Sequence, residues 1–255
     1  MNSITEQIIE TAYYCGKILI NADRTKLKVD EKEGQANFVT DYDRRIEEIL
    51  RDKLSETVEN AAFIGEEGEY GSFEKEGYVY IVDPIDGTTN FIKDYHASCI
   101  SIALLKEGEP YIGVIYNPYL DEMFYAERGN GAFCNNEPIH VSNHSLSEGI
   151  VLFGSSPYNE ELNKKSFEIA YDLFQKSLDI RRSGSAALDL CSVAAGRAEL
   201  YFELILSPWD YAAGTLIVRE AGGTVTDCDG NKVVYDRKCS ILARGNGKQM
   251  PCSLN

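Results

Sequence analysis

Two aspartates, Asp83 and Asp86, stand at the end of an apolar run, with a proline between them and a glycine and two threonines after them. The run at 78–82 is typical of a buried strand, so both carboxylates should lie where that strand ends. Carboxylate oxygens are ligands for hard divalent cations. Gly87 then allows a sharp turn whose backbone N–H groups can face an anion. Aspartate, proline and glycine also form ordinary tight turns, which is the alternative for this segment taken alone.

Other acidic residues are predicted at the ends of other elements. Glu66 follows a short apolar segment at 61–64, Asp43 lies in the first turn of a predicted helix, and Asp210 begins another helix. A surface loop is the alternative for Glu66, and a favourable interaction with the helix dipole is the alternative for Asp43. No histidine or cysteine accompanies these carboxylates, so an all-oxygen site would suit Mg²⁺, or Mn²⁺, better than zinc. Carboxylates gathered in one cleft repel one another, so cations would be needed to keep them ionised there.

The elements that must position these residues fall into two halves around a polar stretch at 142–147. Hydrophobic periodicity predicts two amphipathic helices, at 3–21 and from about 41, and then a mostly antiparallel meander. The second half alternates strands and helices, which is typical of an α/β layer. Its predicted strands are 150–153, 180–182, 199–204, 224–226, 232–235 and 240–243, and its predicted helices are 160–176, 185–195 and one from 209. We therefore expect an N-terminal α+β half at 1–145 with the metal site and a C-terminal α/β half at 146–255 with substrate-facing residues, together forming one compact catalytic unit.

Composition restricts the class of protein. With 255 residues and 44% apolar side chains, the chain can bury an ordinary core. The net charge of −16 would repel nucleic acid and anionic membranes, so neither is an expected partner. The seven cysteines are odd in number and never spaced as CxxC, which favours free thiols in a reducing cytoplasm. No run of 18 apolar residues and no signal-peptide pattern is present, so we expect a cytoplasmic protein without a transmembrane helix.

The chain resembles the inositol monophosphatase family, which belongs with fructose-1,6-bisphosphatases to the Mg²⁺-dependent, lithium-sensitive phosphatases. The resemblance runs nearly end to end and is carried by four blocks in the right order. These blocks are VTxxD at 39–43, FIGEE at 63–67, VDPIDGTTNF at 82–91, and WDYAAG at 209–214 followed by EAGG at 220–223. The resemblance implies an α+β fold built as an α/β/α/β/α layered sandwich, with a catalytic cleft between the halves. It also implies a homodimer.

The same resemblance implies hydrolysis of a phosphate monoester by a metal-activated water, with three metal ions. The implied metal ligands are Glu66, Asp83, Asp86, Asp210 and the main-chain carbonyl of Ile85. Thr88, hydrogen-bonded to Asp43, would position the water together with Glu66, and Lys32 would add a supporting charge. The implied contacts to this small-molecule substrate are Asp86, Gly87, Thr88, Arg181, Gly184, Ser185, Ala186, Glu203 and Asp210.

Glu203 stands seven residues before Asp210, the spacing of the family's glutamate that binds a ring hydroxyl, so myo-inositol monophosphate is the expected substrate. A polar strand end is the alternative for Glu203. The arginine pair at 181–182 offers more charge than a monophosphate needs, which keeps a fructose-1,6-bisphosphatase or a bifunctional enzyme as an alternative. Phosphatases of 3′-phosphoadenosine 5′-phosphate or NADP come next. A regulatory binding protein that retains the site is the non-enzymatic alternative.

Overall fold

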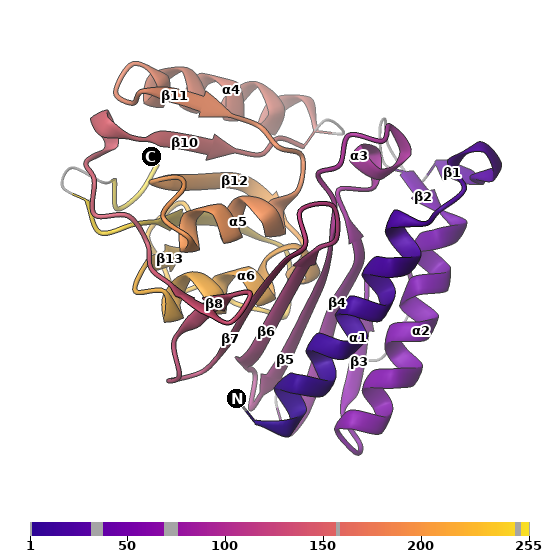
Figure 1. The fold of residues 1–255 in the computed structure, drawn as a ribbon. Helices are drawn as coiled ribbons and strands as arrows, with labels where there is room; N and C mark the ends of the chain where they lie inside the picture. The colour runs from indigo at the N-terminus through magenta and orange to yellow at the C-terminus, as the bar shows by residue number, and fades with distance from the viewer. Residues whose placement is uncertain (1, 32–37, 69–75, 157–158, 248–250, 255) are drawn as a thin grey trace.

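The computed structural model describes residues 2–31, 38–68, 76–156, 159–247 and 251–254. Helices and sheets alternate in layers (Figure 1). Two helices, α1 (Ser3–Ile20) and α2 (Asp41–Thr57), cover the outer face of a first sheet. Two central helices, α5 (Ala186–Ala194) and α6 (Pro208–Glu220), lie between this sheet and a second one. The outer face of the second sheet is covered by α4 (Glu160–Phe174). The predicted α/β/α/β/α sandwich is confirmed.

The first sheet is the predicted meander. In the described part of the chain its strands follow one another in order: β3 (Ala62–Gly65), β4 (Tyr78–Asp86), β5 (Cys99–Lys106), β6 (Glu109–Asn117), β7 (Glu122–Glu127), β8 (Ala132–Cys134) and β9 (Glu137–Ile139). β3 is parallel to β4, and each later pair is antiparallel. β4 extends to Asp86, further than the apolar run predicts, so Asp83 and Asp86 belong to the strand itself.

The second sheet has the order β11-β10-β12-β14-β13. Its strands are β10 (Ile150–Phe153), β11 (Asp179–Arg181), β12 (Leu200–Leu206), β13 (Thr224–Thr226) and β14 (Cys239–Arg244). β10 is parallel to β11 and β12, whereas β14 is antiparallel to β12 and β13. The smaller elements are the pair β1 (Val29–Glu31) and β2 (Phe38–Thr40), the short helix α3 (Thr88–Ile92), and the 3-10 helices η1 (Arg24–Lys26) and η2 (Leu146–Glu148).

The predicted strand at 232–235 is wrong, because side chains take the place of a strand partner there. The Tyr211 hydroxyl lies 2.6 Å from the carbonyl oxygen of Val234 and 2.9 Å from that of Arg237. Tyr235 is buried, and its hydroxyl accepts a hydrogen bond from Arg219 at 2.8 Å. The apolar residues at 233–235 therefore belong to an irregular segment that is anchored on α6.

Different helices bury different surfaces according to their layer. α1 and α2 are amphipathic and bury one stripe each against the first sheet, whereas α5 and α6 are covered on both sides. The central helices are accordingly rich in small residues, which allow close approach to the strands. All seven cysteines are free thiols. Among the described residues, no helix combines the length and the apolar character needed to span a bilayer.

The contact between β6 and α6 provides a test of this packing. A Cβ atom added at Gly113 would lie 2.7 Å from the carbonyl oxygen of Ala213, a backbone atom that cannot swing aside. Gly113→Ala should therefore push α6 away from the first sheet and lower the free energy of unfolding by about 1 to 3 kcal/mol. Urea denaturation followed by circular dichroism measures this change. An unaltered unfolding midpoint would contradict the close packing of α6 on β6.

Candidate active site

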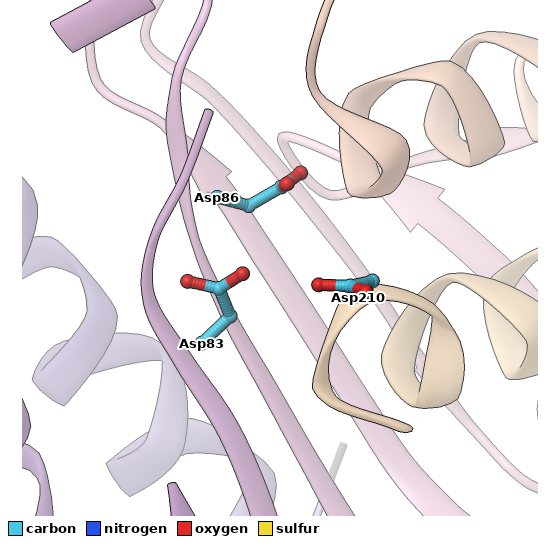
Figure 2. Close-up of side chains that lie close together, drawn as sticks. All are labelled: Asp83, Asp86 and Asp210. Carbon is cyan, nitrogen blue, oxygen red and sulfur yellow. The ribbon is translucent and has the colours of Figure 1, made fainter. Parts of the chain in front are cut away.

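Three aspartates meet where β4 ends and α6 begins. One oxygen from each of Asp83, Asp86 and Asp210 lies within 4.8 Å of the others, and Figure 2 shows the three side chains turned toward one another. Residues three apart on a regular strand point to opposite faces. The pairing of β4 with β5 shifts register between Asp83 and Asp86, and this irregularity lets both carboxylates face α6.

Hydrogen bonds fix the orientation of each carboxylate. Oδ1 of Asp83 accepts from the backbone N–H of Ile85 at 3.0 Å. Oδ2 of Asp210 accepts from the N–H of Ser207 at 2.7 Å, as part of the capping box that begins α6. Oδ2 of Asp86 accepts from the Ser185 hydroxyl at 2.5 Å and, in the first turn of α5, from the N–H of Ala187 at 2.8 Å.

The three carboxylates are poorly stabilised as anions. Burial raises the pKa of Asp83 well above its ordinary value, and the nearby charges of Glu66, Asp86 and Asp210 raise this pKa further. Burial also raises the pKa of Asp210 and of Asp86, although the hydrogen bonds from Ser185 and Ala187 oppose the shift at Asp86. Two buried carboxylates and a partly buried third, with hard oxygen donors at this spacing, fit a divalent cation such as Mg²⁺, which would replace the protons.

Beside the three aspartates, the structure joins Thr88 to Asp43. The Thr88 hydroxyl lies 3.2 Å from Oδ1 of Asp43 and 3.1 Å from the carbonyl oxygen of Ile85. Oδ2 of Asp43 accepts hydrogen bonds from both the N–H and the hydroxyl of Thr40, in the capping box that begins α2. Asp43 therefore interacts favourably with the dipole of α2 and also binds Thr88. Burial raises the pKa of Asp43 to about 6, against the effect of its hydrogen bonds to Thr40.

Gly87 makes the turn between Asp86 and α3. Its φ of +88° lies in the left-handed region, and a Cβ atom there would lie 2.9 Å from the carbonyl oxygen of Ala97. The amides of Gly87 and Thr88 therefore come at the start of α3, where helix N–H groups lack partners within the helix.

A cavity of about 140 Å³ adjoins the aspartates. Its lining residues come from both sheets and from the start of α5: Asp86, Gly154, Ser155, Arg182, Gly184, Ser185, Ala186, Asp189, Glu203, Leu206 and Asp210. All the predicted substrate contacts of the second half are among them except Arg181. Arg181 instead forms an ion pair with Asp179 on β11, while Arg182 lies in the cavity lining and donates from Nε to Ser155 at 2.9 Å. Lys32 lies outside the described residues.

Glu203 is one of the acidic residues that line this cavity. Its Oε2 accepts a hydrogen bond from the Tyr201 hydroxyl at 2.8 Å. Burial raises the pKa of Glu203 to about 7, and this hydrogen bond opposes the shift. A Cβ atom at Gly154 would lie 1.7 Å from Oε2, so only glycine leaves room for the carboxylate. Gly154 carries no sequence signal for this role, because its contact with Glu203 arises from the pairing of β10 with β12.

The comparison with family models decides the assignment. The model described as the inositol monophosphatase family matches residues 1–253. The chain belongs to the inositol monophosphatase family. It is thus a member of a phosphatase family.

Relatives and solved structures agree with this assignment. The chain is 37% identical to the inositol-1-monophosphatase of Rhizobium meliloti, over 90% of this chain and 87% of the relative. It is 40% identical to the Nus factor SuhB of Vibrio cholerae, over 85% of this chain and 80% of the relative. Among solved structures, inositol monophosphatase II of Staphylococcus aureus with inositol monophosphate bound has a TM-score of 0.77 and 30% identity, covering 95% of this chain and 87% of that one.

The raised carboxylate pKa values make the stability of the cation-free enzyme depend on pH. A carboxyl whose folded pKa lies above its unfolded value stabilises the fold at low pH, and this contribution is lost as the pH rises through the folded pKa. For Asp43 this loss takes place between about pH 4 and pH 6 and lowers the free energy of unfolding by on the order of 3 kcal/mol. The raised pKa values of the aspartate cluster act in the same direction. In a chelator, melting temperature should therefore fall from pH 5 to pH 8.

Asp83→Asn removes one buried charge from the cluster and is the matched test of this effect. The variant should melt at a higher temperature than the wild type at pH 8 in EDTA, and its melting temperature should depend less on pH. Differential scanning fluorimetry across a pH series measures both. A wild-type enzyme whose melting temperature without cations is higher at pH 8 than at pH 5 would contradict the destabilising repulsion within the cluster.

Proposed function

We propose that this chain is a Mg²⁺-dependent phosphatase that hydrolyses the phosphate monoester of a small polyol, with myo-inositol monophosphate as the expected substrate. The observation that carries the proposal is that Asp86 and Asp210 belong both to the aspartate cluster and to the lining of the polar cavity. A phosphate held at the cluster would therefore place its alcohol group in that cavity.

Each group of the site has a role in this chemistry. Asp83, Asp86, Asp210, Glu66 and the carbonyl of Ile85 would hold the cations, and bound Mg²⁺ would lower the pKa of water and neutralise developing negative charge. Thr88, anchored by Asp43, would orient the attacking water together with Glu66. The amides of Gly87 and Thr88 would bind the phosphate oxygens.

The cavity supports a polyol over the alternative substrates. Glu203 offers an acceptor, or a donor when protonated, to a ring hydroxyl. A second phosphate, as in fructose-1,6-bisphosphate, would meet Glu203 and the buried Asp189, with Arg182 as the cation in the lining.

A regulatory role is the second candidate, favoured by the relative named Nus factor SuhB. The two roles differ in what they require. A binding-only protein has no need of the Asp43–Thr88 hydrogen bond beside the cluster, whereas a hydrolase needs a positioned water. Retention of a partner from lysate with negligible turnover across phosphate esters would favour the regulatory role. The homodimer, the lithium sensitivity and the cytoplasmic location stay predictions.

Phosphate release tests the hydrolase directly. The enzyme should release phosphate from inositol 1-phosphate in Mg²⁺, and faster than from fructose-1,6-bisphosphate, 3′-phosphoadenosine 5′-phosphate or NADP. EDTA should abolish the activity. Asp83→Asn should lower kcat/KM on the order of 100-fold or more, because it removes a direct cation ligand. Full activity in EDTA would refute the cation requirement.

Glu203→Ala tests the choice of alcohol. Losing a hydrogen bond to a charged group costs about 1.5 to 3 kcal/mol, so KM for inositol 1-phosphate should rise about 10- to 100-fold. The variant should discriminate less against fructose-1,6-bisphosphate, since one of the repelling carboxylates is gone. Steady-state kinetics on both substrates measures this ratio. An unchanged ratio would remove Glu203 from substrate selection.

A further inference from the structure

Glu47 is a buried carboxylate that the proposed chemistry does not use. It lies on α2 with 2% of its surface exposed, one helical turn after Asp43. Its neighbour Glu48 is exposed. Glutamate is seldom buried this deeply unless a partner compensates for the lost hydration. The groups that contact the Glu47 carboxylate therefore indicate its role.

The Glu47 carboxylate lies against the end of β3, next to Glu66. Its Oε2 accepts a hydrogen bond from the backbone N–H of Glu67 at 2.9 Å. A Cβ atom at Gly65 would lie 2.2 Å from the same oxygen, so the carboxylate occupies the place where any other residue would carry its side chain. The residues before and after Glu66 thus both contact Glu47.

Glu66 lies beside the end of β4. β3 is parallel to β4 and Gly65 pairs with Val82, so Glu66 and Asp83 directly follow this pair on the two neighbouring strands. The turn at 65–67 therefore lies between the buried face of α2 and the end of β4. β3 is a four-residue strand at the edge of its sheet, with β4 as its strand neighbour, so the sheet alone restrains this turn weakly.

We propose that Glu47 is a positioning residue: by holding the backbone on both sides of Glu66, it presents the Glu66 carboxylate to Asp83 and so completes the cation site. The inference rests on the proposed function, since it concerns the affinity for the cation. Two residues one turn apart on α2 would then serve the same site, Asp43 by anchoring Thr88 and Glu47 by anchoring the turn that carries Glu66.

Mn²⁺ binding, counted by electron paramagnetic resonance, tests the role without relying on turnover. Glu47→Ala should raise the Mn²⁺ concentration for half-saturation about tenfold or more, the usual effect of losing a group that orients a metal ligand. Glu47→Gln keeps an acceptor oxygen for the N–H of Glu67 and should recover most of the affinity. Glu48→Ala, an exposed neighbour on the same helix, should bind as the wild type does.

Kinetics and a second variant separate positioning from simple stability. Raising Mg²⁺ should restore most of kcat in Glu47→Ala, because the cluster itself is intact. Gly65→Ala keeps the glutamate at position 47 but pushes its carboxylate away from the turn. This variant should weaken Mn²⁺ binding in the same way, and it provides the test if Glu47→Ala does not fold. Wild-type Mn²⁺ affinity in folded Glu47→Ala or in folded Gly65→Ala would overturn the proposal. A wild-type enzyme that binds no Mn²⁺ would overturn the proposed function instead.

Discussion

Repulsion among the carboxylates of Asp83, Asp86 and Asp210 is the constraint on which the rest of the site depends. Two unit charges about 4 Å apart interact by roughly 4 kcal/mol at an effective dielectric constant near 20, and burial adds a desolvation cost. The free energy of unfolding of a stable domain is only about 5 to 15 kcal/mol in total. The chain can therefore keep this cluster only if protons or cations neutralise it. The proposed hydrolysis of a phosphate ester would use the cation-loaded form of the cluster.

The two central helices begin at the cluster and reduce this cost in part. α6 starts at Pro208, two residues before Asp210, and the first turn of α5 donates the N–H of Ala187 to Asp86. A helix N-terminus stabilises a nearby anion by about 0.3 to 1 kcal/mol, and up to about 2 when partly buried. These amounts are smaller than the repulsion of one pair. The helices orient the carboxylates, and protons or cations would have to supply the rest of the neutralisation.

The layered fold and the members of the aspartate cluster were predictable because their signals are local or carried by contiguous motifs. Amphipathic periodicity predicts α1 and α2, and Asp83 and Asp86 follow directly from an apolar run. Pairing across the chain is what sequence patterns miss. The register shift that turns Asp86 toward Asp210 depends on β5, and the choice of Arg182 over Arg181 as a lining residue depends on the pairing of β11 with β10. The segment at 232–235 has the β-branched and aromatic residues typical of a strand, but the carbonyl of Val234 accepts a hydrogen bond from the hydroxyl of Tyr211.

The site also joins three layers of the fold that pack against one another through a common hydrophobic core. Asp83 comes from the first sheet, Asp210 from a central helix and Glu203 from the second sheet. A cation held by Asp83 and Asp210 would therefore link the layers directly, and the free energy of its binding would add to the stability of their packing. Glu47 and Asp43 would extend the same coupling to α2 on the outer layer. Cation binding and the alignment of the layers would then depend on one set of contacts, so weakening either should weaken the other.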